Sequence, residues 1–189
     1  MEIFKDKRMA WAIAAMIIFA VIFIDTEREL NAIKRPVAQL LETGSVSVGD
    51  SLQRCLQVRL DNAANLIAIA ERYESISGNN AILILRSARD ELINVTHLPE
   101  KCTANRKLSE AAQLLYYILT DESLSEEDYA LAENEYSNIK NSDYNIAFEA
   151  ANYNDRAREF NRLTGVFPGV VVKALGMTSE LELFEEAAN

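Results

Sequence analysis

The chain has 189 residues, which is enough for one domain of ordinary size with a sizeable core. Hydrophobic residues make up 49% of it, and only 6 glycines and 3 prolines occur, which favours helices over a turn-rich β fold. The formal net charge is −10, and nucleic-acid affinity comes mainly from lysine and arginine contacts to phosphates. We therefore predict an all-α protein and exclude nucleic acid as a partner.

The first element in chain order is an uncharged apolar run, Met9 to Ile24. As a helix it would span about 24 Å, slightly less than the hydrocarbon core of about 30 Å. Basic residues precede the run, and no pair of small residues follows it at cleavage-site spacing, which disfavours a buried core helix and a cleaved signal peptide. We predict an uncleaved signal anchor over residues 1–25. Its membrane-facing residues include Met9, Trp11, Ile17, Ile18 and Ile24.

The orientation of this anchor follows from the basic residues on its two sides. Three of them lie at positions 5–8, directly before the apolar run, and three more lie between positions 28 and 35. The rule that basic residues stay inside favours a cytoplasmic N-terminus, because the first group adjoins the run. The rest of the chain is then expected outside the cytoplasm. A surface this acidic is repelled by anionic lipids, so attachment must be hydrophobic.

A connecting helix and loop are predicted over residues 26–50. Pro36 either kinks this helix or begins a new one, because proline lacks an amide donor. Asp50 or Ser51 is expected to cap the next helix, over residues 51–77. Gly78-Asn79-Asn80 then interrupts the helical pattern.

The middle of the chain predicts two more helices. The first resumes after Asn80 and ends at His97-Leu98-Pro99. A polar connection over 99–105 leads to the second, over 106–120. Ser123 and Ser125 are each followed three residues later by an acidic residue, which is typical of the start of a helix.

The last helix carries the clearest periodicity in the chain. Apolar or small residues recur in alternating steps of three and four, which predicts that one face of the helix is buried among neighbouring helices. Asp143 is the carboxylate in this series, and we expect it to set the register or reach the rim, because burying it unpaired would be costly. The series, called the seam below, is Tyr129, Ala132, Tyr136, Ile139, Asp143, Ile146, Ala150, Tyr153, Ala157, Phe160 and Thr164.

The chain turns back after the seam. Gly165 is expected to end the last helix in a left-handed conformation, followed by a turn at Phe167-Pro168-Gly169. The apolar stretch 170–177 is too short to span a bilayer, so it is predicted to pack as a tail.

The sequence offers little chemistry. Cys55, Cys102 and His97 are too few for a metal site, and no phosphate-binding loop or Ser-His pair can be assigned. The two cysteines could form a disulfide in an oxidising compartment or remain small buried hydrophobes in a reducing one. We therefore predict no catalytic residues, no metal and no cofactor.

Two stretches resemble the LemA family of bacterial membrane-anchored helical proteins. Arg59 to Ile67 is similar to that family's Arg-x-Asp-Leu-Ile-Pro-Asn-Leu-Val, with Ala64 in place of the proline. The other stretch is the end of the chain, where the matching residues are Ile146-Ala147, Tyr153-Asn154-Asp155, Phe160-Asn161, Phe167-Pro168-Gly169, Ala174, Gly176 and Phe184-Glu185-Glu186-Ala187.

The resemblance implies an N-terminal anchor followed by an antiparallel bundle of three to four long helices, here residues 51–189 with a C-terminal tail. It also implies a single-pass protein of the bacterial inner membrane. It brings no catalytic residue. One functional hypothesis is a non-enzymatic scaffold that binds other envelope proteins or itself. The alternative is an extracytoplasmic sensor of a small ligand.

Three polar residues of the family-like region lie just outside the seam: Asn154, Asp155 and Asn161. Their structural role would be to pair with neighbouring helices near Asp61 and Asn65, as most buried polar groups are satisfied within the protein. Their functional role would be to form a partner-binding surface near the end of the bundle. Both interpretations remain open at the level of the sequence.

Overall fold

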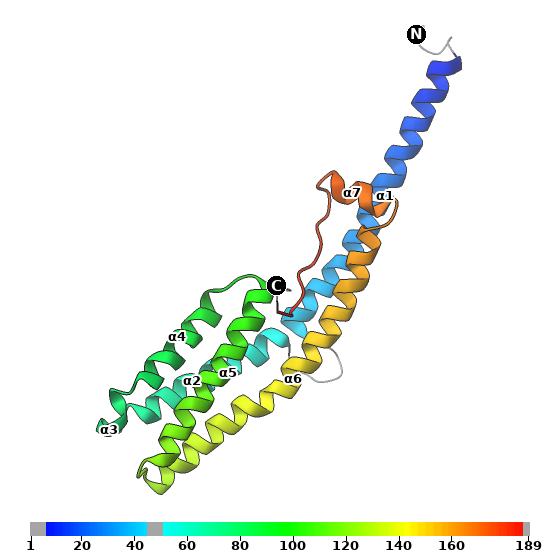
Figure 1. Cartoon of the computed structure of the whole chain (residues 1–189). Helices are drawn as coiled ribbons and strands as arrows, with labels where there is room; N and C mark the ends of the chain where they lie inside the picture. The colour runs from blue at the N-terminus through cyan, green and yellow to red at the C-terminus, as the bar shows by residue number, and fades with distance from the viewer. Residues whose placement is uncertain (1–6, 45–50, 187–189) are drawn as a thin grey trace. The chain divides into compact units, whose positions relative to one another are not determined.

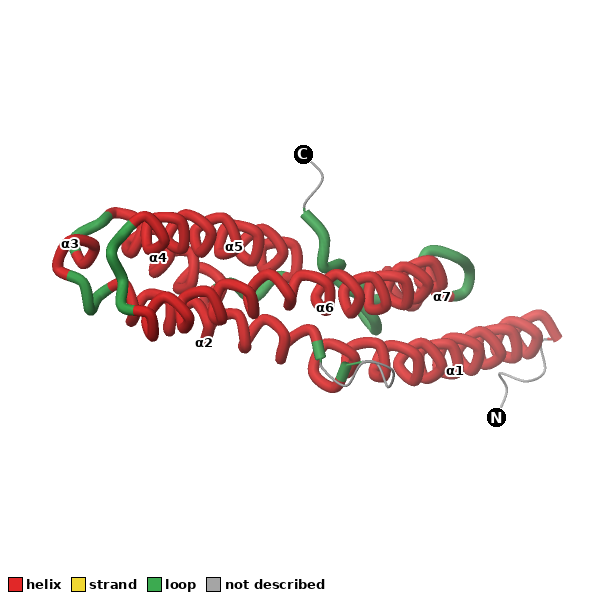
Figure 2. The backbone as a smooth tube through the Cα atoms, turned by 90° about the horizontal axis from the view of Figure 1, so that it is seen from below, coloured by secondary structure: helices red, strands yellow, loops and turns green. Residues whose placement is uncertain are grey.

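The structure is a computed structural model that describes residues 7–44 and 51–186. Within these ranges every regular element is a helix and no strand occurs, which confirms the predicted all-α class. The described residues form two compact units, 7–38 with 155–181 and 39–154 with 182–186. Helices α1 and α6 each contribute to both units, so the chain path in Figures 1 and 2 is described below one unit at a time.

Helix α1, Lys7–Thr43, is 37 residues long, or about 56 Å, and therefore exceeds the thickness of a bilayer core. Pro36 lies inside it, so the helix does not restart there. None of its most apolar 18-residue stretch is buried, and the side chain of Trp11 is 76% exposed. A helix long and apolar enough to span a membrane is confirmed. The predicted membrane-facing residues Met9, Trp11, Ile17, Ile18 and Ile24 are all exposed.

The first unit has a small core of its own. Leu30 of α1 and Phe160 at the end of α6 pack with Val172 of α7, Gly169–Ala174. Gly169 permits this packing, because a Cβ there would lie 2.3 Å from the carbonyl oxygen of Leu163. The stretch 170–177 therefore packs within this unit as a short helix and a turn.

The glycines that end α6 and α7 do so in different ways. Gly176 has a φ of +72° and closes α7, where the Met177 N–H donates to the Val172 carbonyl at 3.1 Å. Gly165 was predicted to be left-handed, but its φ is not positive. Its N–H instead donates to the Arg162 carbonyl at 3.1 Å, so a tighter turn ends α6 and that prediction is wrong.

The second unit is built from the helices between the two long ones. Helices α2, α4 and α5 pack against one another, and the first part of α6 contributes to the same apolar core. Figures 1 and 2 both show α4 beside α5. The bounds are α2 Leu52–Ala70, α3 Glu74–Ser77, α4 Asn80–Asn94, α5 Leu98–Asp121 and α6 Glu126–Thr164.

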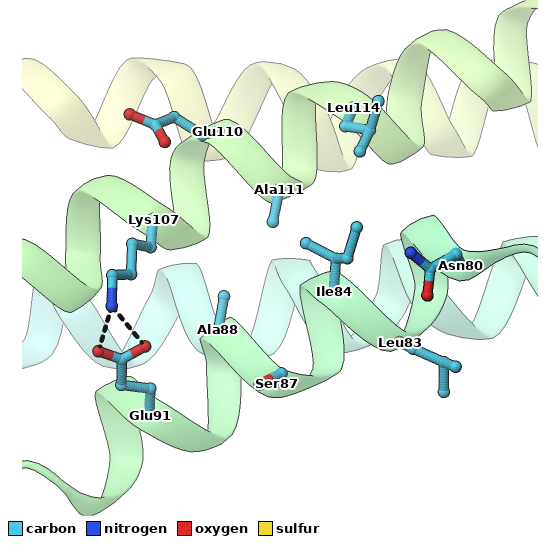
Figure 3. Close-up of a pocket in the computed structure, with 10 residues that line it drawn as sticks. All are labelled: Asn80, Leu83, Ile84, Ser87, Ala88, Glu91, Lys107, Glu110, Ala111 and Leu114. Carbon is cyan, nitrogen blue, oxygen red and sulfur yellow. Dashed lines mark hydrogen bonds and ion pairs between the residues drawn. The ribbon is translucent and has the colours of Figure 1, made fainter.

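A shallow groove of about 540 Å³ runs between α4 and α5. Its apolar lining includes Leu83, Ile84 and Leu114, which are all exposed. The Lys107 ammonium lies 2.8 Å from the Glu91 carboxylate at one end of the groove (Figure 3). The groove is open to solvent, since these apolar side chains are 58%, 41% and 42% exposed, respectively.

Three predicted breaks and caps are confirmed. The Ser51 hydroxyl accepts from the Arg54 N–H at 3.1 Å and caps α2. Asn79, in the predicted interruption, caps α4 by accepting from the Ala81 N–H at 2.9 Å. The Ser125 hydroxyl accepts from the Asp128 N–H at 3.1 Å, and α6 begins one residue after Ser125.

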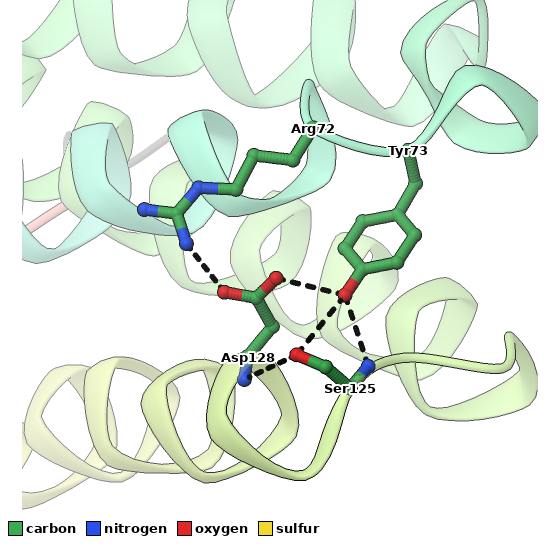
Figure 4. A network of polar contacts seen from close by, with 4 residues as sticks. All are labelled: Arg72, Tyr73, Ser125 and Asp128. Carbon is green, nitrogen blue, oxygen red and sulfur yellow. Dashed lines mark hydrogen bonds and ion pairs between the residues drawn. The ribbon is translucent and has the colours of Figure 1, made fainter.

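The predicted helix over 51–77 is interrupted, because α2 ends at Ala70. The reason is a polar network at the start of α6 (Figure 4). The Tyr73 hydroxyl accepts from the Ser125 N–H at 3.0 Å and donates to the Asp128 carboxylate at 2.8 Å, and Arg72 pairs with the same carboxylate. These tertiary bonds outweigh the helical propensity of the segment.

The predicted polar connection over 99–105 is wrong, since α5 already begins at Leu98. Pro99 occupies the first turn of α5, where the missing N–H costs nothing because the first amides of a helix have no partner within it. Sequence reasoning treated this proline as a helix breaker. The adjacent His97 is the residue that precedes the helix.

The seam of α6 is buried over most of its length. Ala132, Ile139 and Ile146 belong to the core of the second unit, and Tyr153 and Phe160 are also at most 2% exposed. The exceptions are Tyr129, which is 43% exposed, the half-buried Tyr136 and the exposed Asp143. The positions that the seam places at the core are Ala132, Ile139, Ile146, Ala150, Tyr153, Ala157, Phe160 and Thr164.

Replacing Ile146 by aspartate should destabilise the second unit by at least about 3 kcal/mol, because it places an unpaired carboxylate in the apolar core. Tyr144→Asp introduces the same side chain two residues away, where the native side chain is 74% exposed, and should cost less than about 1 kcal/mol. Thermal unfolding followed by circular dichroism compares the two. Equal shifts of Tm would mean that the seam is not the buried face.

Candidate interaction surface

The second unit holds the C-terminal segment 182–186, which has no regular secondary structure, through side chains of its helices. The central contact is made by the side-chain amide of Asn154, a residue that is only 6% exposed. Its nitrogen donates to the Phe184 carbonyl at 3.0 Å, and its oxygen accepts from the Phe184 N–H at 2.8 Å. One side chain therefore satisfies both backbone groups of Phe184.

Tyr153 makes the next backbone contact. Its hydroxyl donates to the Glu182 carbonyl at 2.7 Å. Burial, and then the charge of Glu182, raise the pKa of Tyr153 to about 12. The hydroxyl therefore remains a donor across the physiological pH range.

The carboxylate of Glu182 lies at the first turn of α5. It accepts from the Leu98 N–H at 2.9 Å and lies 2.6 Å from Nδ1 of His97. These two contacts, the Leu98 N–H above all, lower the pKa of Glu182 from its ordinary value. In return the bond to Glu182, followed by the charges of Glu182 and Glu100, raises the pKa of His97. The positive end of the α5 dipole also favours the ionised carboxylate of Glu182.

Phe184 and Glu186 complete the contacts. Phe184 is 5% exposed and belongs to the core of the second unit, together with Ile146 and Ala150 of α6. Arg106 of α5 donates to the Glu186 carboxylate at 2.6 Å. We call the set that receives the segment the tail seat: His97, the Leu98 N–H, Arg106, Tyr153, Asn154 and the apolar surroundings of Phe184. The tail seat offers hydrogen-bond donors to carboxylates and carbonyls, one side-chain amide that bonds a backbone N–H and C=O, and one apolar pocket.

The three residues of the predicted interaction surface have separate roles. Asn154 is buried against the tail, whereas the Asp155 side chain is 81% exposed and lies 3.5 Å from Arg158. Asn161 belongs to the first unit, where its amide donates to the Leu181 carbonyl and accepts from the Leu181 N–H, both at 2.8 Å. The proposed helix partner Asp61 bonds Gln57 within α2 instead. Each asparagine therefore binds the backbone of a C-terminal residue, Phe184 or Leu181, and not a neighbouring helix.

A second polar cluster ties three helices of this unit. The side chain of Arg59 on α2 is fully buried, and it donates to Asp143 on α6 at 2.6 Å and to Ser109 on α5. Desolvation lowers the pKa of Arg59, while Asp143 opposes that effect. Asp143 thus reaches the rim, one of the two roles expected from the sequence, and pairs there with Arg59. Its partner lies 84 residues away, and sequence reasoning missed it.

The two cysteines are both free thiols in the structure. Cys55 is buried, and Cys102 is partly exposed on the wall of a groove of about 300 Å³ beside Phe184. Burial is the main cause that raises the pKa of the Cys102 thiol. In the described residues no group of three or more His, Cys, Asp or Glu side chains could hold a metal ion.

Searches against protein-family models and against curated proteins found no match to the chain. The site therefore has to be judged on its own geometry. That geometry was only partly foreseeable: the positions of Asn154 and Asn161 beside the seam marked them as unusual, but the backbone that they bind could not be read from spacing. The acidic segment around Phe184 was noted only as part of a resemblance.

Asn154→Ala should lower the stability of the second unit by about 2 kcal/mol, because two buried hydrogen bonds are lost and the Phe184 backbone is left without partners. Asp155→Ala, at the next position, removes an exposed carboxylate and should change stability by less than about 0.5 kcal/mol. Chemical denaturation of both variants measures the difference. A mild effect at both positions would contradict the assigned role of the Asn154 amide.

The pH dependence of the tail seat can be followed at His97, the one histidine of the chain. Its pKa should lie above the ordinary value of about 6.5, and Glu182→Gln should return it toward that value. A raised histidine pKa stabilises below its unfolded value, and a lowered glutamate pKa stabilises above its own. The charged pair is therefore complete between about pH 4.3 and 6.5 and weakens on either side.

NMR titration of the His97 ring measures this pKa directly. Glu100→Gln is the control, because Glu100 contributes less to the shift than Glu182 does. A His97 pKa that is unchanged by Glu182→Gln would show that the carboxylate does not hold the ring in solution.

Proposed function

We propose that this chain is a non-enzymatic, membrane-anchored helical-bundle protein of the bacterial envelope that works by binding other proteins. The observation that carries the proposal is the apolar N-terminal stretch of α1, none of which is buried in the protein. Leaving so much apolar surface in water would be unfavourable, whereas a bilayer accommodates it. The helix would cross the bacterial inner membrane once, with its N-terminus in the cytoplasm.

The second unit would then stand outside the cytoplasm as an antiparallel bundle of α2, α4, α5 and the first part of α6. Support comes from the short connections between successive helices, such as the three residues between α4 and α5, which favour antiparallel neighbours. This organisation agrees with a divergent member of the LemA family, which remains part of the proposal.

A binding role suits the side chains that the unit exposes and buries. The groove between α4 and α5 offers exposed leucine and isoleucine side chains to a partner. Three buried polar groups, Arg59, Tyr153 and Asn154, are occupied with other parts of the same chain. They hold the bundle together, which is a structural task.

Crosslinking in intact membranes tests this proposal. The full-length chain should stay in the membrane fraction after a carbonate wash and should carry crosslinked protein partners. Ile18→Arg should reduce both signals, because a charge near the centre of the span costs about 2.5–3.5 kcal/mol on insertion scales.

The matched control is Ile33→Arg, which introduces the same charge at a 41% exposed position beyond the apolar run. It should leave the chain in the membrane fraction. Extraction of the unmodified chain by carbonate would reject the anchor. A retained chain that crosslinks to no protein would reject the binding role.

A further inference from the structure

The tail seat recognises its segment by features that a separate molecule could also present. Asn154 and Tyr153 bond only backbone atoms of Glu182 and Phe184, so these contacts require main-chain groups in the right place and no particular side chain. Peptide-binding proteins commonly read extended segments through such main-chain bonds. The geometry of the seat is that of a peptide receptor whose occupant is covalently attached.

The specificity of the seat comes from three side-chain positions of the occupant. Glu182 bonds the His97 ring and the Leu98 N–H, Phe184 enters the apolar core, and Glu186 pairs with Arg106. These positions are every second residue of the segment, which bends at Phe184 and Glu185. The seat therefore selects the pattern Glu-x-Phe-x-Glu.

The segment is held in the seat by ionic, backbone and apolar contacts. Both of its ionic contacts are half exposed: His97 and Glu182 are 63% and 46% exposed, and Arg106 and Glu186 are 55% and 53% exposed. Ionic contacts of this kind contribute little stability. Most of the affinity thus comes from Asn154, Tyr153 and Phe184, a set small enough to dissociate and rebind.

We infer that the tail seat also binds segment 182–186 of a second copy of this chain, so that copies associate by exchanging their tails. This rests on, and deepens, the proposed binding role by naming the partner. Every copy carries both the seat and the segment that fits it, so an exchanged tail repeats the contacts already described and needs no new ones. The attached tail has an effective concentration in the millimolar range, which disfavours exchange in dilute solution.

Confinement in a membrane changes that balance, because anchored copies meet at high local concentration in two dimensions. Exchange is reciprocal, since each copy that donates its tail also leaves its own seat open to a neighbour. The arrangement would close as a dimer when two copies exchange with each other.

Two variants that both keep the N-terminal anchor separate the seat from the segment. A chain that ends at Leu181 keeps the seat and lacks the segment. The double variant Tyr153→Phe with Asn154→Ala keeps the segment but lacks the side chains that bind its backbone. Each carries a different tag, and they are mixed in detergent micelles at low chain-to-micelle ratio. The two variants should co-purify as a one-to-one pair, and neither should pair with itself.

Adding Phe184→Ala to the tail donor should weaken this pairing at least about tenfold, because the buried aromatic anchor is lost. Leu183→Ala, which changes the neighbouring side chain, should weaken it less. A synthetic peptide of residues 182–189 should bind the chain that ends at Leu181 and displace the donor.

Absence of pairing between variants that retain native helicity would overturn the inference, as would pairing that survives Phe184→Ala. Loss of helicity on removal of 182–189 would also overturn it, because the segment would then be a part of the core that cannot be exchanged. Peptide binding to the truncated chain that is unaffected by Asn154→Ala would show that the seat is not the receptor. None of these results depends on crosslinked partners in cells, so they are distinct from a failure of the proposed function.

Discussion

The buried guanidinium of Arg59 is the interaction on which the packing of the second unit depends. Its side chain is 0% exposed and reaches Ser109 on α5 and Asp143 on α6 from α2. Removing a charge from water costs several kcal/mol, and Asp143 and Ser109 offset that cost only while the three helices keep their register. Among the described residues, Nε of Arg59 is one of the buried polar atoms without a partner, so the compensation is incomplete. If one of the three helices slid along another, Arg59 would lose these partners and its burial would no longer be offset.

This constraint explains why the seam of α6 could be predicted while its partners could not. Alternating steps of three and four residues are a local property, and burial of Ile139, Ile146 and Phe160 follows from them directly. Asp143 was expected to set the register or reach the rim, because burying an unpaired carboxylate would be costly. Its partner Arg59 depends on how distant helices pack, which no periodicity reports. The all-α class and the seam could thus be predicted from the sequence, whereas the polar contacts between different helices could not.

The errors at helix ends have equally physical origins. Pro99 stands at the start of α5, because a first-turn residue needs no amide donor, although proline inside a helix would break it. The break after Ala70 is imposed by Tyr73, whose hydroxyl bonds Ser125 and Asp128 on α6. The predicted cap at Gly165 was wrong because a tight turn satisfies its amide without a left-handed residue. Of these three boundaries, only the one after Ala70 depends on a contact that is distant in the sequence.

The identity of residue 154 follows from what an unpaired backbone requires. The segment 182–186 has no helix or strand partner, so the N–H and C=O of Phe184 need one donor and one acceptor from elsewhere. Aspartate could only accept, lysine could only donate, and a serine hydroxyl is too short to bridge both atoms at once. A carboxamide carries both groups at the right separation, and asparagine supplies it with few rotatable bonds. The residues that had no evident use in a helical bundle are thus explained by a segment that is not helical.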